Sequence, residues 1–200
     1  METTSLLLTT PVLTDYSQST NQCEYEREIL NEMLNFTNQD NQPMLDWFRQ
    51  FGISIRIIIF NVHAYRMGLR FGFEDINFDE YGWLKKPKFL DIQELHFGIA
   101  QKERFGTYST ITLGRGLNGI WTFGLSAAFG IAGSSSGICV YGKIFPSKDQ
   151  AQRYAADHLK RMMLPKVGNS DTTNFNQKVI LATLKDLERL EVNTVQLALF

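Results

Sequence analysis

The feature that most constrains the fold is a series of four strand-like segments between residues 93 and 145. They are rich in β-branched and aromatic residues and are separated by the turn-like sequences KERFG, GRGLNG and GSSSG. Their ranges are 93–100, 108–113, 120–129 and 138–145. Short turns join neighbouring strands in opposite directions, and Asn118-Gly119 tolerates the positive φ of a tight hairpin. The series therefore predicts an antiparallel β-meander.

Two amphipathic helices are expected after the meander. Ser147 can cap the first, with Gln150 completing a capping box, and apolar side chains then recur on one face as far as Met162. A second helix is expected over residues 173–190, where apolar side chains again recur at helical spacing. These features predict an α+β protein. Its antiparallel meander of three to five strands packs against the C-terminal helices, and N-terminal helices complete the core.

The first half of the chain is expected to be mainly helical. Residues 23–36 have the apolar spacing of an amphipathic helix, and Pro43 can open a second short helix that ends near Gly52. Residues 53–60 are rich in isoleucine and alternate poorly, which fits a buried strand or the start of a buried helix; we favour the strand. The expected organisation is a flexible arm at 1–22, a helical and irregular part at 23–92, the sheet with two helices at 93–190, and a tail at 191–200.

Composition and charge exclude several classes of protein. Twenty basic and 21 acidic side chains leave a net charge of −1, so no overall field attracts the chain to nucleic acid or anionic membranes. No stretch resembles a signal peptide or approaches the roughly 20 apolar residues of a membrane span. Cys23 and Cys139 fit no zinc or disulfide pattern, and the three histidines show no metal-ligand spacing. We expect a cytoplasmic protein without a metal or cofactor.

In residues 108–163, strands lead into a helix that begins SKDQAQRYAADHL. This arrangement resembles the sheet and final helix of double-stranded RNA-binding domains. In that family, lysines at the start of the helix contact phosphates and one face of the sheet is open to solvent. Lys148 matches one of those lysines, while Asp149 and Gln152 depart from the pattern. The resemblance implies a nucleic-acid-binding surface with these candidate residues: Lys148, Arg153, Lys160 and Arg161.

The pentapeptide at residues 196–200, QLALF, resembles the peptide with which bacterial replication and repair proteins bind the sliding clamp. In that family, the Leu and Phe side chains enter a hydrophobic pocket and the Gln side chain hydrogen-bonds at a neighbouring subsite. Gln196, Leu197, Leu199 and Phe200 match, and alanine replaces the usual Ser or Asp between them. The resemblance implies a protein partner bound through these four residues. Alternatively, residues 195–200 form an edge strand or a plug in the protein's own core.

A third cluster combines basic and aromatic residues. Lys85, Lys86 and Lys88 lie between Trp83 and Phe89. Such interleaving suits single-stranded nucleic acid, whose bases stack on aromatic rings while its phosphates attract lysines. The three lysines are therefore further candidates for contact with nucleic acid.

The leading hypothesis is a non-catalytic accessory or adaptor protein of bacterial or mobile-element DNA metabolism. It would bind a partner, the sliding clamp, through the QLALF peptide. One alternative is a nucleic-acid-binding protein, or an inhibitor of a host defence system that targets nucleic acid. Another is a metal-dependent nuclease that uses acidic residues between 74 and 94, because paired carboxylates can bind a divalent ion.

Overall fold

The computed structural model describes residues 8–19, 21–99 and 106–197, with side chains as far as Glu191. The chain divides into two compact units, an N-terminal unit, Met1–Pro87, and a C-terminal unit, Lys88–Phe200. Each unit contains a hydrophobic core, and the two cores share no residue. Within the described ranges, no helix has both the length and the apolar character that crossing a bilayer requires.

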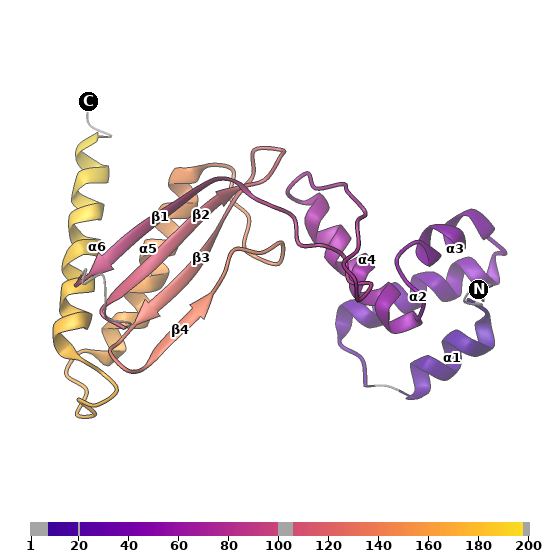
Figure 1. The fold of residues 1–200 in the computed structure, drawn as a ribbon, viewed down its shortest axis with the longest axis horizontal. Coiled ribbons are helices and arrows are strands. Elements are labelled where there is room, and N and C mark those ends of the chain that lie inside the picture. The colour runs from indigo at the N-terminus through magenta and orange to yellow at the C-terminus, as the bar shows by residue number, and fades with distance from the viewer. Residues whose placement is uncertain (1–7, 20, 100–105, 198–200) are drawn as a thin grey trace. The chain divides into compact units, whose positions relative to one another are not determined.

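The C-terminal unit contains a four-stranded antiparallel sheet in the order β1-β2-β3-β4 (Figure 1). Its strands are β1 (Leu90–Gly98), β2 (Tyr108–Arg115), β3 (Trp121–Ala128) and β4 (Gly133–Ser136). Strands that follow each other in the chain pair with each other. This arrangement confirms the predicted α+β class and the antiparallel meander.

The fourth strand lies earlier in the chain than the sequence predicts. The prediction of a strand at residues 138–145 is wrong, because this stretch is irregular apart from one bridge between Trp121 and Phe145. β4 instead uses the serines of GSSSG, which pair with the end of β3. The chain after β4 passes over Gly124, where a Cβ atom would lie only 2.7 Å from the backbone nitrogen of Ile138. The missing side chain of Gly124 therefore makes room for a segment that has left the sheet.

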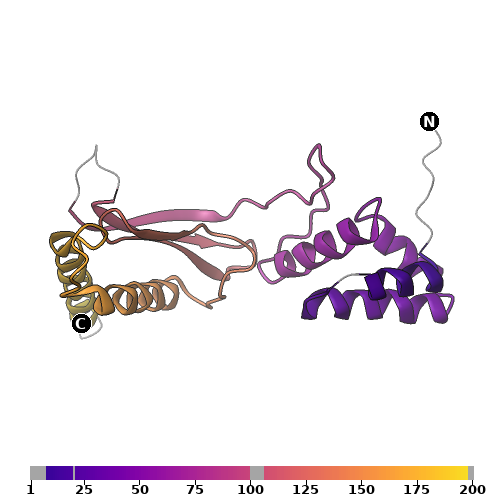
Figure 2. The ribbon, with the colours of Figure 1, turned by 90° about the horizontal axis from the view of Figure 1, so that it is seen from below.

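Two helices cover the same face of the sheet (Figure 2). α5 (Lys148–Met163) packs on β2 and β3, and α6 (Gln177–Leu197) packs mainly on β1. A short 3₁₀ helix, η1 (Leu164–Lys166), follows α5. Ser147 caps α5 by accepting a hydrogen bond from the backbone N–H of Gln150, as the capping pattern predicts. α6 begins later than expected and continues beyond residue 190.

The sheet has one apolar and one polar face, because alternate residues of a strand point to opposite sides. Ile111 and Leu125 lie opposite each other on the apolar face and share a core with Leu159 of α5 and with Leu184 and Leu187 of α6. The polar face carries exposed or partly exposed side chains from the other strand positions. These include Glu94, His96, Thr110, Thr112 and Ser126. An antiparallel sheet with helices on one side commonly leaves its polar side to solvent.

The N-terminal unit contains four helices packed around the second core. They are α1 (Thr10–Ser19), α2 (Glu24–Asn38), α3 (Gln42–Arg49) and α4 (Ile55–Leu69). Part of the segment expected to be a flexible arm, residues 1–22, is α1, and it is anchored because Leu8 and Leu13 are buried in the core. Residues 1–7 and 20 lie outside the described residues.

The prediction of a strand at residues 53–60 is wrong, because α4 occupies this stretch. Ser54 caps α4 by accepting a hydrogen bond from the backbone N–H of Ile57. The fully or nearly buried apolar side chains then recur at intervals of three and four residues. They are Ile55, Ile58, Ile59 and Val62. The pattern is therefore that of a helix, which the apolar neighbours at other positions conceal.

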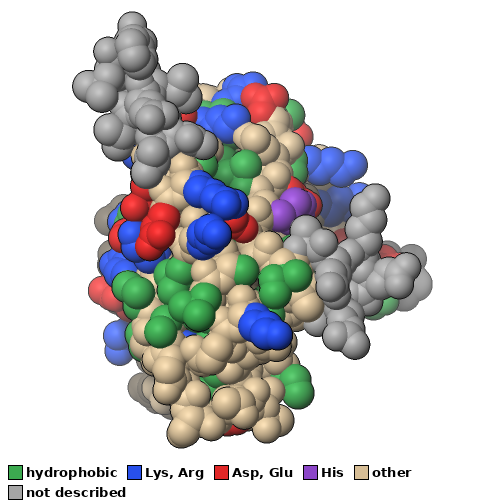
Figure 3. All heavy atoms as spheres, turned by 90° about the vertical axis from the view of Figure 1, so that its left-hand side faces the viewer, with side chains coloured by type: hydrophobic (Ala, Val, Ile, Leu, Met, Phe, Trp, Pro, Cys, Tyr) green, Lys and Arg blue, Asp and Glu red, His purple; other side chains and the backbone are tan. Residues whose placement is uncertain are grey.

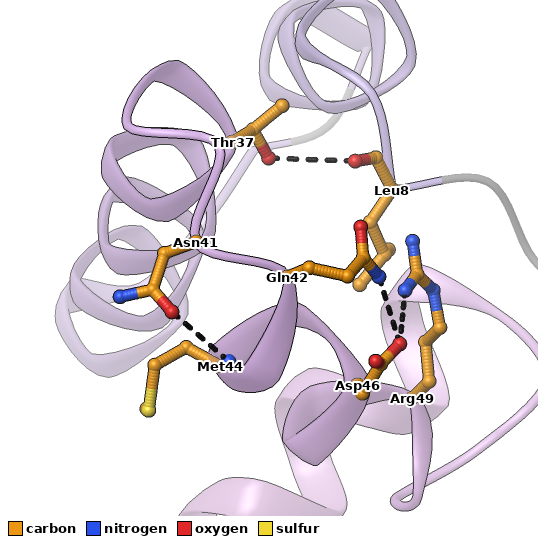
Figure 4. Close-up of polar contacts among 7 residues, drawn as sticks. All are labelled: Leu8, Thr37, Asn41, Gln42, Met44, Asp46 and Arg49. Atoms are coloured by element: carbon orange, nitrogen blue, oxygen red, sulfur yellow. Dashed lines mark hydrogen bonds and ion pairs between the residues drawn. The ribbon is translucent and has the colours of Figure 1, made fainter.

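Local polar contacts hold the turn between α2 and α3 (Figure 4). The side-chain oxygen of Asn41 caps α3 by accepting a hydrogen bond from the backbone N–H of Met44. Gln42 and Arg49 both donate hydrogen bonds to Asp46, and these lower the pKa of the Asp46 carboxyl below its ordinary value. A proline stands in the first turn of α3, as the sequence predicts.

A hairpin-like loop at residues 77–85 is held against α4 by Asn61. The Asn61 amide donates hydrogen bonds to the carbonyl oxygens of Phe51 (2.7 Å) and Gly82 (2.8 Å). Its side-chain oxygen accepts one from the backbone N–H of Leu84 (2.9 Å). These three bonds explain how a polar side chain can be only 2% exposed inside this unit.

Candidate functional site

Two of the four residues that resemble the clamp-binding peptide lie in α6. The backbone of Gln196 and Leu197 is helical, whereas Leu199 and Phe200 lie outside the described residues. A helix that continues to Leu197 contradicts the alternative of an edge strand over residues 195–200 for the part that the structure describes. Leu190, six residues before Gln196, packs partly buried against the core.

The predicted basic and aromatic cluster lies mostly on the surface, although its second aromatic residue, Phe89, is partly buried, and the exposed Tyr81 lies beside it without having been predicted. Lys85, Lys86 and Lys88 are exposed, Trp83 is 41% exposed and Tyr81 is 73% exposed. The loop that Asn61 holds contains Tyr81, Trp83 and Lys85, and Lys86 follows it in the N-terminal unit. Lys88 belongs to the C-terminal unit, so the structure does not place all three lysines on one body.

Further aromatic rings extend this surface over α4 and α2. Trp83 packs edge-on against Phe60, with ring centroids 6.1 Å apart, and Phe60 packs edge-on against Tyr25 at the same distance. The guanidinium group of Arg56 lies over Phe60 at 5.8 Å, and Tyr25 stacks on His63 at 3.8 Å. The sequence does not indicate these four residues as a group, because only the tertiary fold brings Tyr25, Arg56, Phe60 and His63 together.

His63 makes the stability of this unit depend on pH. Burial, and next the nearby Arg66 guanidinium, lower the pKa of His63 below its ordinary value, while Glu28 raises it to a smaller extent. The folded chain therefore binds a proton at His63 less readily than the unfolded chain does. Protonation of this imidazole consequently weakens folding.

We expect the free energy of unfolding of the N-terminal unit to fall as the pH is lowered from 7 through the ordinary histidine pKa of 6.5 to the depressed pKa of folded His63. The His63→Gln variant cannot gain this proton and should show a smaller fall. Urea titrations at about pH 7 and pH 5 compare the two proteins. The same pH dependence in both would show that His63 is not responsible.

Two acidic residues of the nuclease hypothesis, Asp79 and Asp91, have structural partners. Asp79 accepts hydrogen bonds from the backbone N–H groups of Tyr81 and Trp83, both at 2.9 Å. Asp91 forms an ion pair with Arg115 at 2.6 Å. In the part of the chain that the structure describes, no three His, Cys, Asp or Glu side chains form a group that could hold a metal ion. These contacts give Asp79 and Asp91 roles in the fold.

The four basic candidates on α5 differ in their surroundings. Lys160 forms an ion pair with Glu191 of α6 at 3.0 Å, and Arg161 forms one with Asp157 at 2.9 Å. Among residues 8–19, 21–99 and 106–191, neither Lys148 nor Arg153 has an ion-pair partner. Lys148 is partly buried and Arg153 is exposed. Only part of the predicted basic surface is therefore available to an external anion.

The structure brings together another cluster that the sequence did not indicate. The Lys143 Nζ atom lies 4.0 Å from the centre of the Tyr154 ring, and the guanidinium carbon of Arg161 lies 5.9 Å from it. The His158 ring is nearly parallel to that of Tyr154 at 6.3 Å. We call Lys143, Tyr154, His158 and Arg161 the Tyr154 cluster. Lys143 comes from the loop before α5, so helical spacing alone does not include it.

The two units carry opposite net charges. Residues 1–87 contain 12 acidic and 7 basic side chains, a net charge of −5, whereas residues 88–200 contain 9 acidic and 13 basic side chains, a net charge of +4. The near-neutral total therefore hides a basic unit. The net charge of the C-terminal unit attracts a polyanion, whereas the negative net charge of the N-terminal unit opposes nucleic-acid binding at Tyr81 and Trp83.

Within the basic unit, the face in Figure 3 does not have a single sign of charge. Acidic and basic side chains lie close together on it, and a group of hydrophobic side chains lies among polar atoms below them. α6 contributes exposed Lys178 and Lys185, but also exposed Glu188 and an ion pair between Arg189 and Asp186 at 3.3 Å. A mixed surface of this kind attracts a polyanion weakly.

Comparisons of this chain with models of protein families, with curated proteins and with solved structures find no match.

Proposed function

We propose that this protein is a non-catalytic accessory protein of bacterial DNA metabolism that binds the sliding clamp through residues 196–200. The observation that carries the proposal is the match of Gln196, Leu197, Leu199 and Phe200 to the clamp-binding pentapeptide. Burial of a leucine or phenylalanine side chain contributes about 1.5–3 kcal/mol before the costs of ordering. The two anchors Leu199 and Phe200 together contribute about 3–6 kcal/mol, which is a large part of the roughly 8 kcal/mol of micromolar binding.

The position of Gln196 and Leu197 at the end of α6 supports this function. α6 is fixed to the sheet by Ile180, Leu184 and Leu187, and Leu190 is partly buried against the same core. Gln196 is six residues further along a helix that extends to Leu197. With a rise of about 1.5 Å per residue, the peptide begins about 9 Å beyond Leu190 along the helix axis. The anchored helix thus holds the backbone of Gln196 and Leu197 beyond the packed part of α6.

The test is calorimetric titration of the full chain with a bacterial sliding clamp. We expect micromolar binding, and we expect Leu199→Ala with Phe200→Ala to weaken it by more than about 100-fold, because two apolar anchors are lost. Leu181→Ala is the matched control, since Leu181 is a 52% exposed leucine of α6 outside the peptide. Absence of binding by the unmodified chain, or unchanged binding by the double variant, would refute the proposal.

A second function, nucleic-acid binding by the C-terminal unit, is favoured by the +4 net charge of that unit. The resemblance to double-stranded RNA-binding domains supports it, since both helices lie on one face of the sheet and Lys148 stands in the first turn of α5. This activity would serve an adaptor at a replication site, and it would also serve an inhibitor of a defence system that targets nucleic acid.

A further inference from the structure

We infer that the Tyr154 cluster is a contact site for the backbone phosphates of a nucleic acid. This inference rests on the proposed nucleic-acid-binding function and assigns it a location. The site differs from the one that the sequence indicated, because it includes Lys143 from the loop before α5 and leaves out Lys160. Three properties of the cluster favour a phosphate ligand: a fixed ring, two nearby cations, and too little negative charge to neutralise them.

The Tyr154 ring is fixed at the edge of the core. It packs against Phe145 at 5.2 Å and Phe123 at 5.8 Å between ring centroids, and Phe145 is 7% exposed. Lys143 and Arg161 both lie within the roughly 6 Å range of a cation–π contact with this ring. The contacts restrict two long side chains that would otherwise lose conformational freedom on binding an anion.

The two cations are close enough to act on the same ligand. At 4.0 Å and 5.9 Å from one ring centre, the Lys143 Nζ atom and the Arg161 guanidinium carbon are at most 9.9 Å apart. Both side chains belong to exposed residues. Two successive phosphates of a strand can therefore meet the two cations, and a guanidinium binds phosphate oxygens through two parallel hydrogen bonds.

The local charge is incompletely balanced. Asp157 is paired with Arg161 at 2.9 Å and is itself 61% exposed in its side chain, so solvent screens this pair. Lys143 has no ion-pair partner among the residues that the structure describes. Two like charges near one ring repel each other, and a bound anion offsets that repulsion. The cluster thus favours occupation by an anion.

The surrounding charges point to a polymer of phosphates. Arg153 precedes Tyr154 in α5 and Lys148 stands in the first turn of the helix, and neither has an ion-pair partner in the described part of the chain. Lys160 is less accessible than Arg161, because its side chain is 28% exposed beside Glu191 whereas the Arg161 side chain is 57% exposed beside Asp157. Cations spread along a helix match the repeated charges of a nucleic-acid backbone better than they match one small anion.

The experiment measures the binding of fluorescent oligonucleotides to the full chain by anisotropy at several salt concentrations. Single-stranded and duplex forms of DNA and RNA are compared. We expect the Lys143→Ala/Arg161→Ala variant to lose about 10-fold or more in affinity at low salt. We also expect its slope of log affinity against log salt to become shallower by about 1.8 on duplex, or about 1.4 on a single strand, because two phosphate contacts are lost.

The matched control is Lys178→Ala/Lys185→Ala, which removes the same charge from exposed positions on α6 of the same unit. It should retain nearly all of the affinity. Equal losses in the two double variants would overturn the site but leave the nucleic-acid function standing. No binding of any oligonucleotide by the unmodified chain, or binding only to anionic lipid vesicles, would overturn both.

The contribution of the Tyr154 ring can be tested separately from that of the two cations. Tyr154→Phe keeps the aromatic face and should bind as the unmodified chain does, whereas Tyr154→Leu releases the two cations and should lose several-fold in affinity. Circular dichroism establishes that each variant is folded. If Tyr154→Leu is folded and binds normally, the ring does not organise the site.

Discussion

Replacement of Asn61 by leucine is expected to lower the free energy of unfolding of the N-terminal unit by about 2–4 kcal/mol. The side chain is 2% exposed and makes three hydrogen bonds to backbone groups of Phe51, Gly82 and Leu84. A leucine of similar size leaves all three groups without this partner, and an unsatisfied buried group costs about 1–3 kcal/mol. Gly82 and Leu84 are only partly buried, so water recovers part of the loss.

Hydrogen–deuterium exchange on the full chain measures this effect, because peptides from α4 report the N-terminal unit separately. Asn35→Leu is the matched control, since Asn35 is an exposed asparagine inside α2. It should change stability by no more than about 0.5 kcal/mol. Unchanged protection of α4 and of the loop at residues 77–85 in the Asn61 variant would show that the three hydrogen bonds are not structural.

Asn61 also illustrates why the strand prediction at residues 53–60 failed. Isoleucine is typical of strands, and three isoleucines in succession conceal a helical period. The signals that distinguish a helix here are Ser54, which caps α4, and the continuation of buried positions to Val62, beyond the stretch read as a strand. Tertiary packing of α4 among α2 and α3 then overrides strand propensity.

The sheet was predictable in class and direction but not in its last strand. Short turns between three strand-like segments specify antiparallel neighbours, and β1, β2 and β3 follow that pattern. β4 consists of glycine and serines, which read as a turn, and its strand geometry comes from pairing with Leu125 to Ala128 of β3. Propensity does not specify such an edge strand, because a neighbouring strand supplies its hydrogen bonds.

The candidate sites were likewise predictable only where they are local sequence patterns. The peptide at residues 196–200 and the lysines of residues 85–88 are visible as local sequence patterns. The Tyr154 cluster is not, because Lys143 reaches Tyr154 only through the irregular segment that bridges Phe145 to Trp121 before α5 begins. Nor does sequence alone reveal that Lys160 is paired with a residue 31 positions away. Position and charge balance both depend on how α5 and α6 pack.

Leu159→Ala is expected to lower the free energy of unfolding of the C-terminal unit by about 3–5 kcal/mol, in the upper part of the range for buried leucines. Leu159 is fully buried between α5 and the sheet. Its neighbours on the inner face of α5, Ala151, Ala155 and Ala156, are too small to fill the space that the leucine leaves. The cavity therefore persists unless the whole helix moves, and it adds to the lost burial of the side chain.

Exchange in β2 and β3 measures this loss, and Leu181→Ala again serves as the control because that leucine is 52% exposed on α6. The control should shift stability by no more than about 0.5 kcal/mol. Leu159 and Tyr154 stand on the same helix, but Leu159 faces the core and Tyr154 faces the cations. Folded Leu159→Ala protein should therefore bind oligonucleotides with nearly unchanged affinity. Weaker binding in proportion to the loss of stability would mean that the packing of α5 and the Tyr154 cluster are energetically coupled, and that the cluster is not an independent surface site.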